Sequence, residues 1–238
     1  KIVLVGDSHA DALSFSLNEK IKENNLSLFR FDTRMYIKNF KQVNDRDNNE
    51  FLENNQNIDK FLKNNSNLII IFHQRWTEQI GRMYFYNNNQ IENPSNLKHS
   101  EYVRIGLKSQ INEIIRLGHK LILVYPVPEL SFIPKRLLWR KYLFEGKFEY
   151  NSKPILSESY EKFKSRNELI FEIFDSIQSD NIYRVYTHKF FCNKQIENKC
   201  IANDENNIFY FDDDHLSIFG SEIVVDEIME IIKTIKFN

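Results

Sequence analysis

The chain has 238 residues, of which 42% are hydrophobic and 14% aromatic, and its formal net charge is -1. This composition fits a globular domain with a sizeable core and argues against disorder. The near-neutral charge gives no overall field that would favour nucleic acid or an anionic membrane. No apolar run approaches the about 20 residues that a membrane helix needs. We therefore expect a single domain over residues 1–238 that binds no nucleic acid and does not itself insert into a membrane.

Apolar runs and helical stretches alternate along the chain. Strands are predicted at 2–5, 26–31, 67–72, 120–125 and 182–186, and helices at 10–24, 49–63, 100–117, 155–179 and 217–235. Continuous apolar runs, such as that of 67–72, are typical of strands buried on both faces. The alternation predicts a mainly parallel five-stranded sheet with helices on both sides, an α/β/α sandwich. Because the chain begins inside a strand, we also expect it to be excised from a longer protein.

Two stretches are irregular. Residues 131–153 are rich in aromatic and basic side chains and are long for a loop, which indicates a functional lid or a short helical insertion. Three of these residues could hold a glycan, although an ordinary solvated helix would look the same: Arg136, Trp139 and Arg140. Residues 188–211 lead into a predicted aromatic strand at 208–211. They also contain Cys192 and Cys200, for which a disulfide in an oxidising compartment is favoured over two free thiols.

Gly6-Asp7-Ser8-His9 follows the first predicted strand and opens a helical stretch. A strand-to-helix turn holds the Ser8 hydroxyl rigidly, which suits a nucleophile. A serine needs a neighbouring base, because its free hydroxyl is a poor nucleophile at neutral pH. The Ser8 amide would lie at a helix N-terminus, where the helix dipole favours an oxyanion. We expect Asp7 to bond turn amides and His9 to be a rim histidine, not a second base.

Asp212-Asp213-Asp214-His215 precedes the last predicted helix. The spacing lets Asp212 reach the imidazole of His215 and orient it, as the carboxylate of a catalytic triad does. Asp213 and Asp214 are expected to be solvated or to cap the helix. An acidic helix cap and a metal site are the alternatives, but the spacing is not that of a calcium loop. Since ligand sites in parallel sheets lie at the carboxyl ends of the strands, Ser8 and His215 should share one rim.

These blocks resemble those of the SGNH/GDSL hydrolases, and more narrowly the SGNH domain at the carboxyl end of acyltransferase-3 membrane proteins. The motifs that carry the resemblance are Gly6 to Ala10, Arg75-Trp76, Pro126-Val127-Pro128-Glu129, the two cysteines, and Asp212 to Gly220. The resemblance implies a flavodoxin-like three-layer fold, a triad of Ser8, His215 and Asp212, and no metal or organic cofactor. It also implies a periplasmic location, tethered to the inner membrane in the full-length protein. There a membrane acyltransferase portion would deliver acyl groups for O-acetylation of a bacterial surface polysaccharide.

The chain departs from the family pattern at the oxyanion hole. The glycine of the second block is missing after the second strand, and the third block has Phe72 to Trp76 in place of its asparagine. Gln74 or Arg75 could substitute as oxyanion donors, while Arg75 could equally form a buried pair with a carboxylate. Trp76 is either a packing residue or a sugar contact. The expected function is an O-acetyltransferase. The alternatives are a carbohydrate O-acetyl esterase, a non-catalytic glycan-binding or docking module, and, with less support, a metal-dependent phosphohydrolase.

Overall fold

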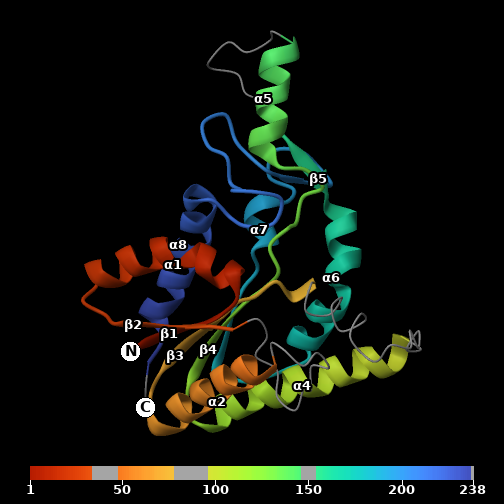
Figure 1. Cartoon of the computed structure of the whole chain (residues 1–238). Coiled ribbons are helices and arrows are strands. Elements are labelled where there is room, and N and C mark those ends of the chain that lie inside the picture. Colours follow the sequence, from red (N-terminus) through yellow and green to blue (C-terminus); the bar gives the residue numbers. More distant parts are fainter. Residues whose placement is uncertain (34–47, 78–95, 146–153, 237–238) are drawn as a thin grey trace.

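A parallel sheet forms the centre of the molecule in the computed structural model, which describes residues 1–33, 48–77, 96–145 and 154–236 (Figure 1). Its five strands have the order β2-β1-β3-β4-β6, and every neighbouring pair is parallel. They are β1 (Ile2–Gly6), β2 (Leu28–Asp32), β3 (Ile69–Phe72), β4 (Lys120–Val124) and β6 (Ile182–Val185). This order is the flavodoxin-like one. The predicted fold class is confirmed, and each predicted strand of the sheet lies within two residues of its observed bounds.

Helices cover both faces of this sheet. Alternate side chains of β1 point to opposite sides, with Ile2 and Leu4 in one apolar cluster and Val3 and Val5 in the other. The first cluster is closed by α1 (Ser8–Glu23) and α8 (Ile218–Thr234). The second is closed by α2 (Asn48–Asn64), α4 (Asn96–Arg116) and α6 (Tyr160–Asp175). Figure 1 shows α1 with α8, and α2 with α4, on opposite sides of the strands.

The first and last helices pack directly against each other. The hydroxyl oxygens of Ser16 on α1 and Ser221 on α8 lie 2.8 Å apart in a buried hydrogen bond. Nearer the far end of α1, Lys20 Nζ lies 2.5 Å from Asp226 Oδ1. Ser8 opens α1 and His215 lies in the loop just before α8, so the packing of these two helices brings together the residues of the predicted serine–histidine pair.

The segment 155–179 differs from its prediction as one helix. It begins with β5 (Ser157–Ser159), which pairs antiparallel with β7 (Lys199–Ile201), and α6 follows. Ser159 ends the strand and caps α6, since its Oγ accepts from the amide of Lys162 at 3.3 Å. The prediction was wrong because the partner strand lies about forty residues away in the chain. The predicted strand at 208–211 is also wrong, because this stretch has only the isolated bridges Asn203–Ile208 and Tyr210–Leu216.

The basic and aromatic stretch contains a helix, α5 (Pro134–Glu145), which confirms the predicted helical insertion as far as residue 145. The remainder of that prediction, 146–153, lies outside the described residues. Figure 1 shows α5 projecting from the body of the molecule beyond β5. Within the described ranges, no helix combines the length and hydropathy that crossing a membrane requires.

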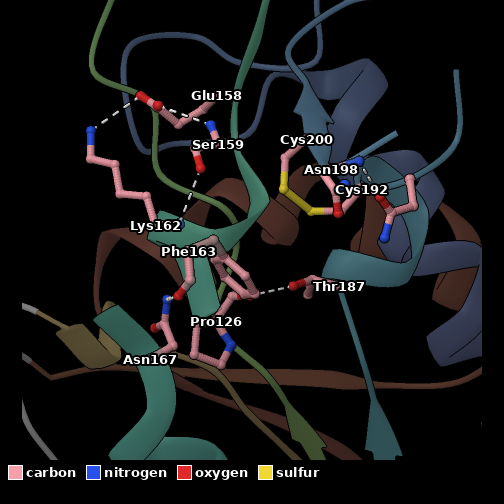
Figure 2. Close-up of a disulfide and its surroundings, with 11 residues drawn as sticks. Pro126, Glu158, Ser159, Lys162, Phe163, Asn167, Thr187, Cys192, Asn198 and Cys200 are labelled. Carbon is pink, nitrogen blue, oxygen red and sulfur yellow. Dashed lines mark hydrogen bonds and ion pairs between the residues drawn. A yellow bond between two sulfur atoms is a disulfide. The ribbon is translucent and has the colours of Figure 1, made fainter. Parts of the chain in front are cut away.

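The two cysteines form a disulfide, as predicted. The bond between Cys192 and Cys200 follows the short helix α7 (His188–Phe191) and joins it to β7. In Figure 2 it lies beside the start of α6, near Phe163, which belongs to the same small apolar cluster. A hydrogen bond from the Thr187 hydroxyl to the Pro126 carbonyl ties this region to the end of β4.

Candidate active site

The turn after β1 depends on the glycine at its end. A Cβ atom at Gly6 would lie only 1.6 Å from the carbonyl oxygen of His73, which follows β3. The amide of His73 in turn donates to the carbonyl of Val5 at 3.1 Å. Gly6 is therefore needed so that the chain after β3 can lie against the start of α1.

Asp7 fixes the next step of the same turn. It is the N-cap of α1, and its Oδ1 accepts from the amide of His9 at 2.9 Å. Its Oδ2 accepts from the amide of Arg75 at 2.9 Å. Asp7 thus has the expected structural role and joins two loops of the rim. Ser8 becomes the first residue of α1, where a backbone N–H has no acceptor within the helix.

A chain of two hydrogen bonds links the side chains of Ser8, His215 and Asp212. Nε2 of His215 is 2.7 Å from Oγ of Ser8, and Nδ1 of His215 is 2.9 Å from Oδ2 of Asp212. Ser8 is exposed, while the histidine is partly buried. This is the geometry in which a carboxylate orients an imidazole and the imidazole accepts the proton of a serine hydroxyl.

Hydrogen bonds from backbone amides to side chains of the same segment fix the loop before α8. Oδ1 of Asp212 accepts from the amides of Asp214 at 3.0 Å and His215 at 2.7 Å, which fixes the turn. Ser217 caps α8 by accepting from the amide of Gly220 at 3.3 Å. A Cβ at Gly220 would lie 2.1 Å from the carbonyl oxygen of Phe209, so only glycine allows this close approach.

Asp214 is buried, with 4% of its surface exposed, so its prediction as a solvated or capping residue was wrong. Its Oδ1 lies 2.9 Å from Nδ1 of His215, and its Oδ2 lies 2.7 Å from Nη1 of Arg75. Nε2 of His9 is 3.4 Å from the same Oδ2. His9 is itself buried, and its ring centroid lies 4.9 Å from that of His215. Asp213 is exposed, as expected.

Arg75 pairs with carboxylates, which was one of its two predicted roles. Besides Asp214 it contacts Glu129, with Nε 3.2 Å from Oε1. Glu129 also accepts a hydrogen bond from the hydroxyl of Thr77, and its Oε2 lies 2.9 Å from Nη1 of Arg166 on α6. Burial alone would raise the pKa of Glu129, but the hydrogen bonds and charges of Arg75, Thr77 and Arg166 hold it below its ordinary value. A chain of alternating charges therefore runs from α6 to His215.

The other predicted site residues lie further from the triad or below the surface. Gln74 is completely buried, and neither amide atom has a hydrogen-bond partner among the described residues. Trp76 lies in the core between Phe72 and Phe174, and its Nε1 donates to the Val124 carbonyl at 3.1 Å, as its interpretation as a packing residue expects. The three glycan candidates Arg136, Trp139 and Arg140 are exposed on α5.

Two histidines of the site have opposite electrostatic surroundings. The close contact of Asp214, opposed by burial and reinforced by Asp212, raises the pKa of His215 to about 9. Complete burial, with a contribution from His9, lowers the pKa of His73 to about 3. His215 therefore holds a proton more firmly than a free imidazole does, while burial keeps His73 neutral. The ligand atoms of His9, Asp214 and His215 lie within 4.8 Å of one another, a spacing that could hold a metal, although Arg75 already supplies a cation to Asp214.

A flavodoxin-like sheet with a Ser-His-Asp arrangement at the carboxyl ends of its strands is the arrangement expected of the SGNH/GDSL class of α/β domains. Within that class the chain belongs to the family described as SGNH domain (fused to AT3 domains), whose model matches residues 1–230. The expected family is thereby confirmed, and with it an SGNH-type domain of a class that modifies acyl groups.

Solved structures agree with this fold. The periplasmic domain of a lipopolysaccharide acetyltransferase from Salmonella ser. Paratyphi A superposes with a TM-score of 0.62 at 17% identity, covering 98% of this chain and 83% of that one. A GDSL-like lipase from Bacteroides thetaiotaomicron superposes with a TM-score of 0.51 at 14% identity, covering 98% and 87%. No curated protein sequence matches the chain.

Proposed function

We propose that this domain moves an acyl group, most simply acetyl, onto a hydroxyl of a bacterial surface polysaccharide. The observation that carries the proposal is the alignment of Ser8 Oγ, His215 Nε2 and Nδ1, and Asp212 Oδ2 within 2.9 Å at each step. The family's fusion to AT3 domains supports a membrane partner that delivers the acyl group. An extracytoplasmic location, tethered to the inner membrane through that partner, is part of the proposal.

The reaction would follow the chemistry of serine acyl transfer. Ser8 Oγ attacks the acyl carbonyl carbon while neutral His215 takes the hydroxyl proton, and the Ser8 amide at the start of α1 donates to the oxyanion. The bond to the donor's leaving group then breaks as His215 returns the proton to it. In the second half the sugar hydroxyl gives its proton to His215 and attacks the acyl carbon. The bond between that carbon and Ser8 Oγ breaks as His215 returns the proton to Oγ, which restores Ser8 and the neutral imidazole. No step needs a metal or an organic cofactor.

Hydrolysis is the second candidate. Ser8 is exposed to solvent, so water could replace the sugar as the second nucleophile. A carbohydrate O-acetyl esterase would use the same residues up to the acyl-enzyme. A non-catalytic glycan-binding module remains the alternative from another class, favoured by the absence of the family's glycine and asparagine at the oxyanion hole.

The acceptor surface is proposed to include the exposed face of α5. Trp139 is 61% exposed and its ring stacks on Tyr142 with centroids 5.8 Å apart. Aromatic faces bind sugar rings, and the neighbouring Arg136 and Arg140 suit an acidic sugar. These residues lie on a helix that projects from the body of the molecule, where a polymer could reach them (Figure 1).

Hydrolysis of an aryl acetate by the wild type and by Ser8→Ala tests the nucleophile. Ser14→Ala is the matched control, since Ser14 lies on the same helix and bonds Asp11 and not His215. We expect activity and labelling by a serine-directed inhibitor in the wild type and the control, and neither in Ser8→Ala. Equal inactivity of all three, without labelling, would support the non-catalytic alternative. Loss of activity on adding a chelator would support a metal-dependent reaction.

Acetylation of the cell-surface polysaccharide by the full-length protein separates the transferase from the esterase. We expect the wild type to add acetyl groups and Ser8→Ala to add none. A wild type that lowers the acetyl content of the polysaccharide would identify an esterase.

A further inference from the structure

The catalytic histidine has two carboxylates beside the same nitrogen. Nδ1 of His215 lies 2.9 Å from Oδ2 of Asp212 and also 2.9 Å from Oδ1 of Asp214. The two carboxylates differ in their surroundings, because the side chain of Asp212 is 29% exposed and that of Asp214 is 5% exposed. A charge near a buried carboxylate is less screened by water, so the buried contact has the larger effect on the imidazole.

Asp214 is held firmly in this position. Arg75 Nη1 lies 2.7 Å from its Oδ2, and Glu129 holds the same guanidinium through Nε and Nη2. The Asp7 carboxylate accepts from the backbone amide of Arg75, which also fixes the loop from which the side chain extends. The carboxyl end of β3, the loop after β4 and the loop before α8 therefore meet at Asp214.

We propose that Asp214 is a second positioning carboxylate of His215, held by Arg75 and Glu129, which stabilises the imidazolium formed when Ser8 gives up its proton. Asp212 holds the Nδ1 proton and the loop, and Asp214 supplies the less screened charge. The proposal deepens the proposed acyl transfer and rests on it for its catalytic meaning. Asp214 is buried and contacts His215, so its effect is exerted through that histidine.

The groups that face His215 come from several elements and must be considered together. Asp212 and Asp214 stand on its own loop, Ser8 and His9 on α1, and Arg75 after β3. The two carboxylates favour the imidazolium, while burial and the cation on Arg75 oppose it. Burial would raise the pKa of Asp214, but its contacts with His215 and His9 hold that pKa well below the ordinary value, so it is ionised when His215 titrates.

The test is the titration of His215, followed by the NMR signal of its Cε1–H in wild type, Asp214→Asn and Asp213→Asn. Asp213 is the matched control, because it is the neighbouring residue, carries the same charge and is exposed. We expect the Asp214→Asn variant to lower the pKa of His215 by at least about one unit, and the Asp213→Asn variant to change it by much less. Equal, small shifts in both variants would overturn the proposal.

A second variant, Asp212→Asn, tests the proposal even if Asp214→Asn does not fold. Asn in place of Asp212 keeps an oxygen for the two turn amides, so Asp212→Asn should retain the loop. With Asp214 still beside Nδ1, we expect its His215 to keep a pKa above the ordinary value of about 6.5. A fall to that value or below would show that Asp212 alone acts on His215, and would refute the role of Asp214.

Kinetics link this role to catalysis. Since one pKa unit changes the fraction of neutral imidazole about tenfold below the pKa, Asp214→Asn should shift the pH profile of aryl acetate hydrolysis to lower pH. A merely structural defect would lower the rate at every pH without moving the profile, and that result would overturn the proposal. Because the NMR titration needs no turnover, an inactive wild type with the expected shifts would refute the proposed function and leave the positioning contact established.

Discussion

Nε2 of His215 lies 2.7 Å from Oγ of Ser8, although 207 positions separate the two residues in the chain. The parallel sheet accounts for this proximity, because the carboxyl end of β1 and the loop before α8 reach the same rim. In the proposed reaction, His215 is also the group whose protonation decides whether Ser8 can react.

Replacing His215 with Ala should remove the base and leave Ser8 without a proton acceptor. We expect the rate of aryl acetate hydrolysis to fall by at least about a thousandfold, as it does when one member of a triad is lost. Steady-state kinetics between about pH 6 and 10 would measure this. His119, which is buried far along the sheet and bonds Leu62, offers a control histidine, and His119→Gln should keep its activity if it folds.

Gly6→Ala should strongly destabilise the fold. The new Cβ would meet the backbone carbonyl oxygen of His73, which cannot move without displacing the chain after β3. We expect a loss of about 3 kcal/mol or more in the free energy of unfolding, measured with urea. Gly118→Ala is the control, because its φ of 83° is strained for alanine but its Cβ meets nothing within 4 Å, and it should cost only about 1 kcal/mol. Similar losses in both variants would contradict the steric explanation.

Reduction of the disulfide should lower stability with little effect on the triad. Cys192 and Cys200 are eight positions apart, and the loop-entropy estimate for so short a loop is about 2–3 kcal/mol. The double variant Cys192→Ala and Cys200→Ala, compared with oxidised and reduced wild type by thermal unfolding, measures this contribution. Neither cysteine takes part in the hydrogen bonds that join Ser8, His215 and Asp212, so labelling of Ser8 should persist at temperatures where the variant is folded. A variant as stable as the oxidised wild type would contradict the expectation.

Acid should destabilise the protein through buried neutral histidines. Burial lowers the pKa of His73 to about 3, whereas in the unfolded chain it is near 6.5, so the unfolded state binds a proton first as pH falls. His73 therefore costs up to about 1.4 kcal/mol of stability per pH unit between about pH 6.5 and 3. His188, with a pKa lowered to about 4 chiefly by burial, acts in the same direction.

His215 changes the free energy of unfolding in the opposite direction and over a different pH range. Its folded pKa is raised to about 9, so its stabilising contribution is complete below about pH 6.5 and is lost as pH rises through 9. Urea unfolding at about pH 5, 7 and 9 should therefore show lower stability at both extremes than near neutrality. Stability that stays constant from pH 7 to 5 would contradict the assignment for His73.

Trp139→Ala on α5 should weaken acceptor binding without changing the triad. We expect a higher KM for a polysaccharide fragment that serves as acceptor and an unchanged kcat/KM for hydrolysis of a small aryl acetate, which is too short to need α5. Phe15→Ala is a matched control, because Phe15 is another large exposed side chain, at 60%, on a different helix. Equal effects of both variants on the polysaccharide would show that α5 does not bind it.

The alternation of apolar runs and helices predicted the five-stranded sheet, and most clearly its three central strands β1, β3 and β4, because these are buried and read as continuous apolar runs. The same reasoning put Ser8, Asp212 and His215 on one rim, where they now lie in contact. It failed for 155–159, because a three-residue strand is stabilised by a distant partner, β7, and not by its own sequence. Local pattern carries no information about such a partner.

The role of Asp214 could not be read from the chain either. In a run of three aspartates, the alternation between exposed and buried positions depends on how the turn is folded, and all three residues look equally suited to solvent. The sequence did contain an indication that a buried carboxylate was needed, in Arg75 and in Glu129 of the Pro-Val-Pro-Glu segment. Each is an ionisable residue placed just after a buried strand, where a charge requires a partner.

The geometry of the site also depends on how α1 packs against α8, through residues that are not part of the site. The Ser16–Ser221 hydrogen bond and the Lys20–Asp226 pair fix how far one helix can slide along the other. Ser8 and His215 stand at the neighbouring ends of these two helices, so a shift of about 1.5 Å, the rise of one helical residue, would break their hydrogen bond. The distance between Ser8 and His215 thus depends on contacts between α1 and α8 that lie well away from both residues.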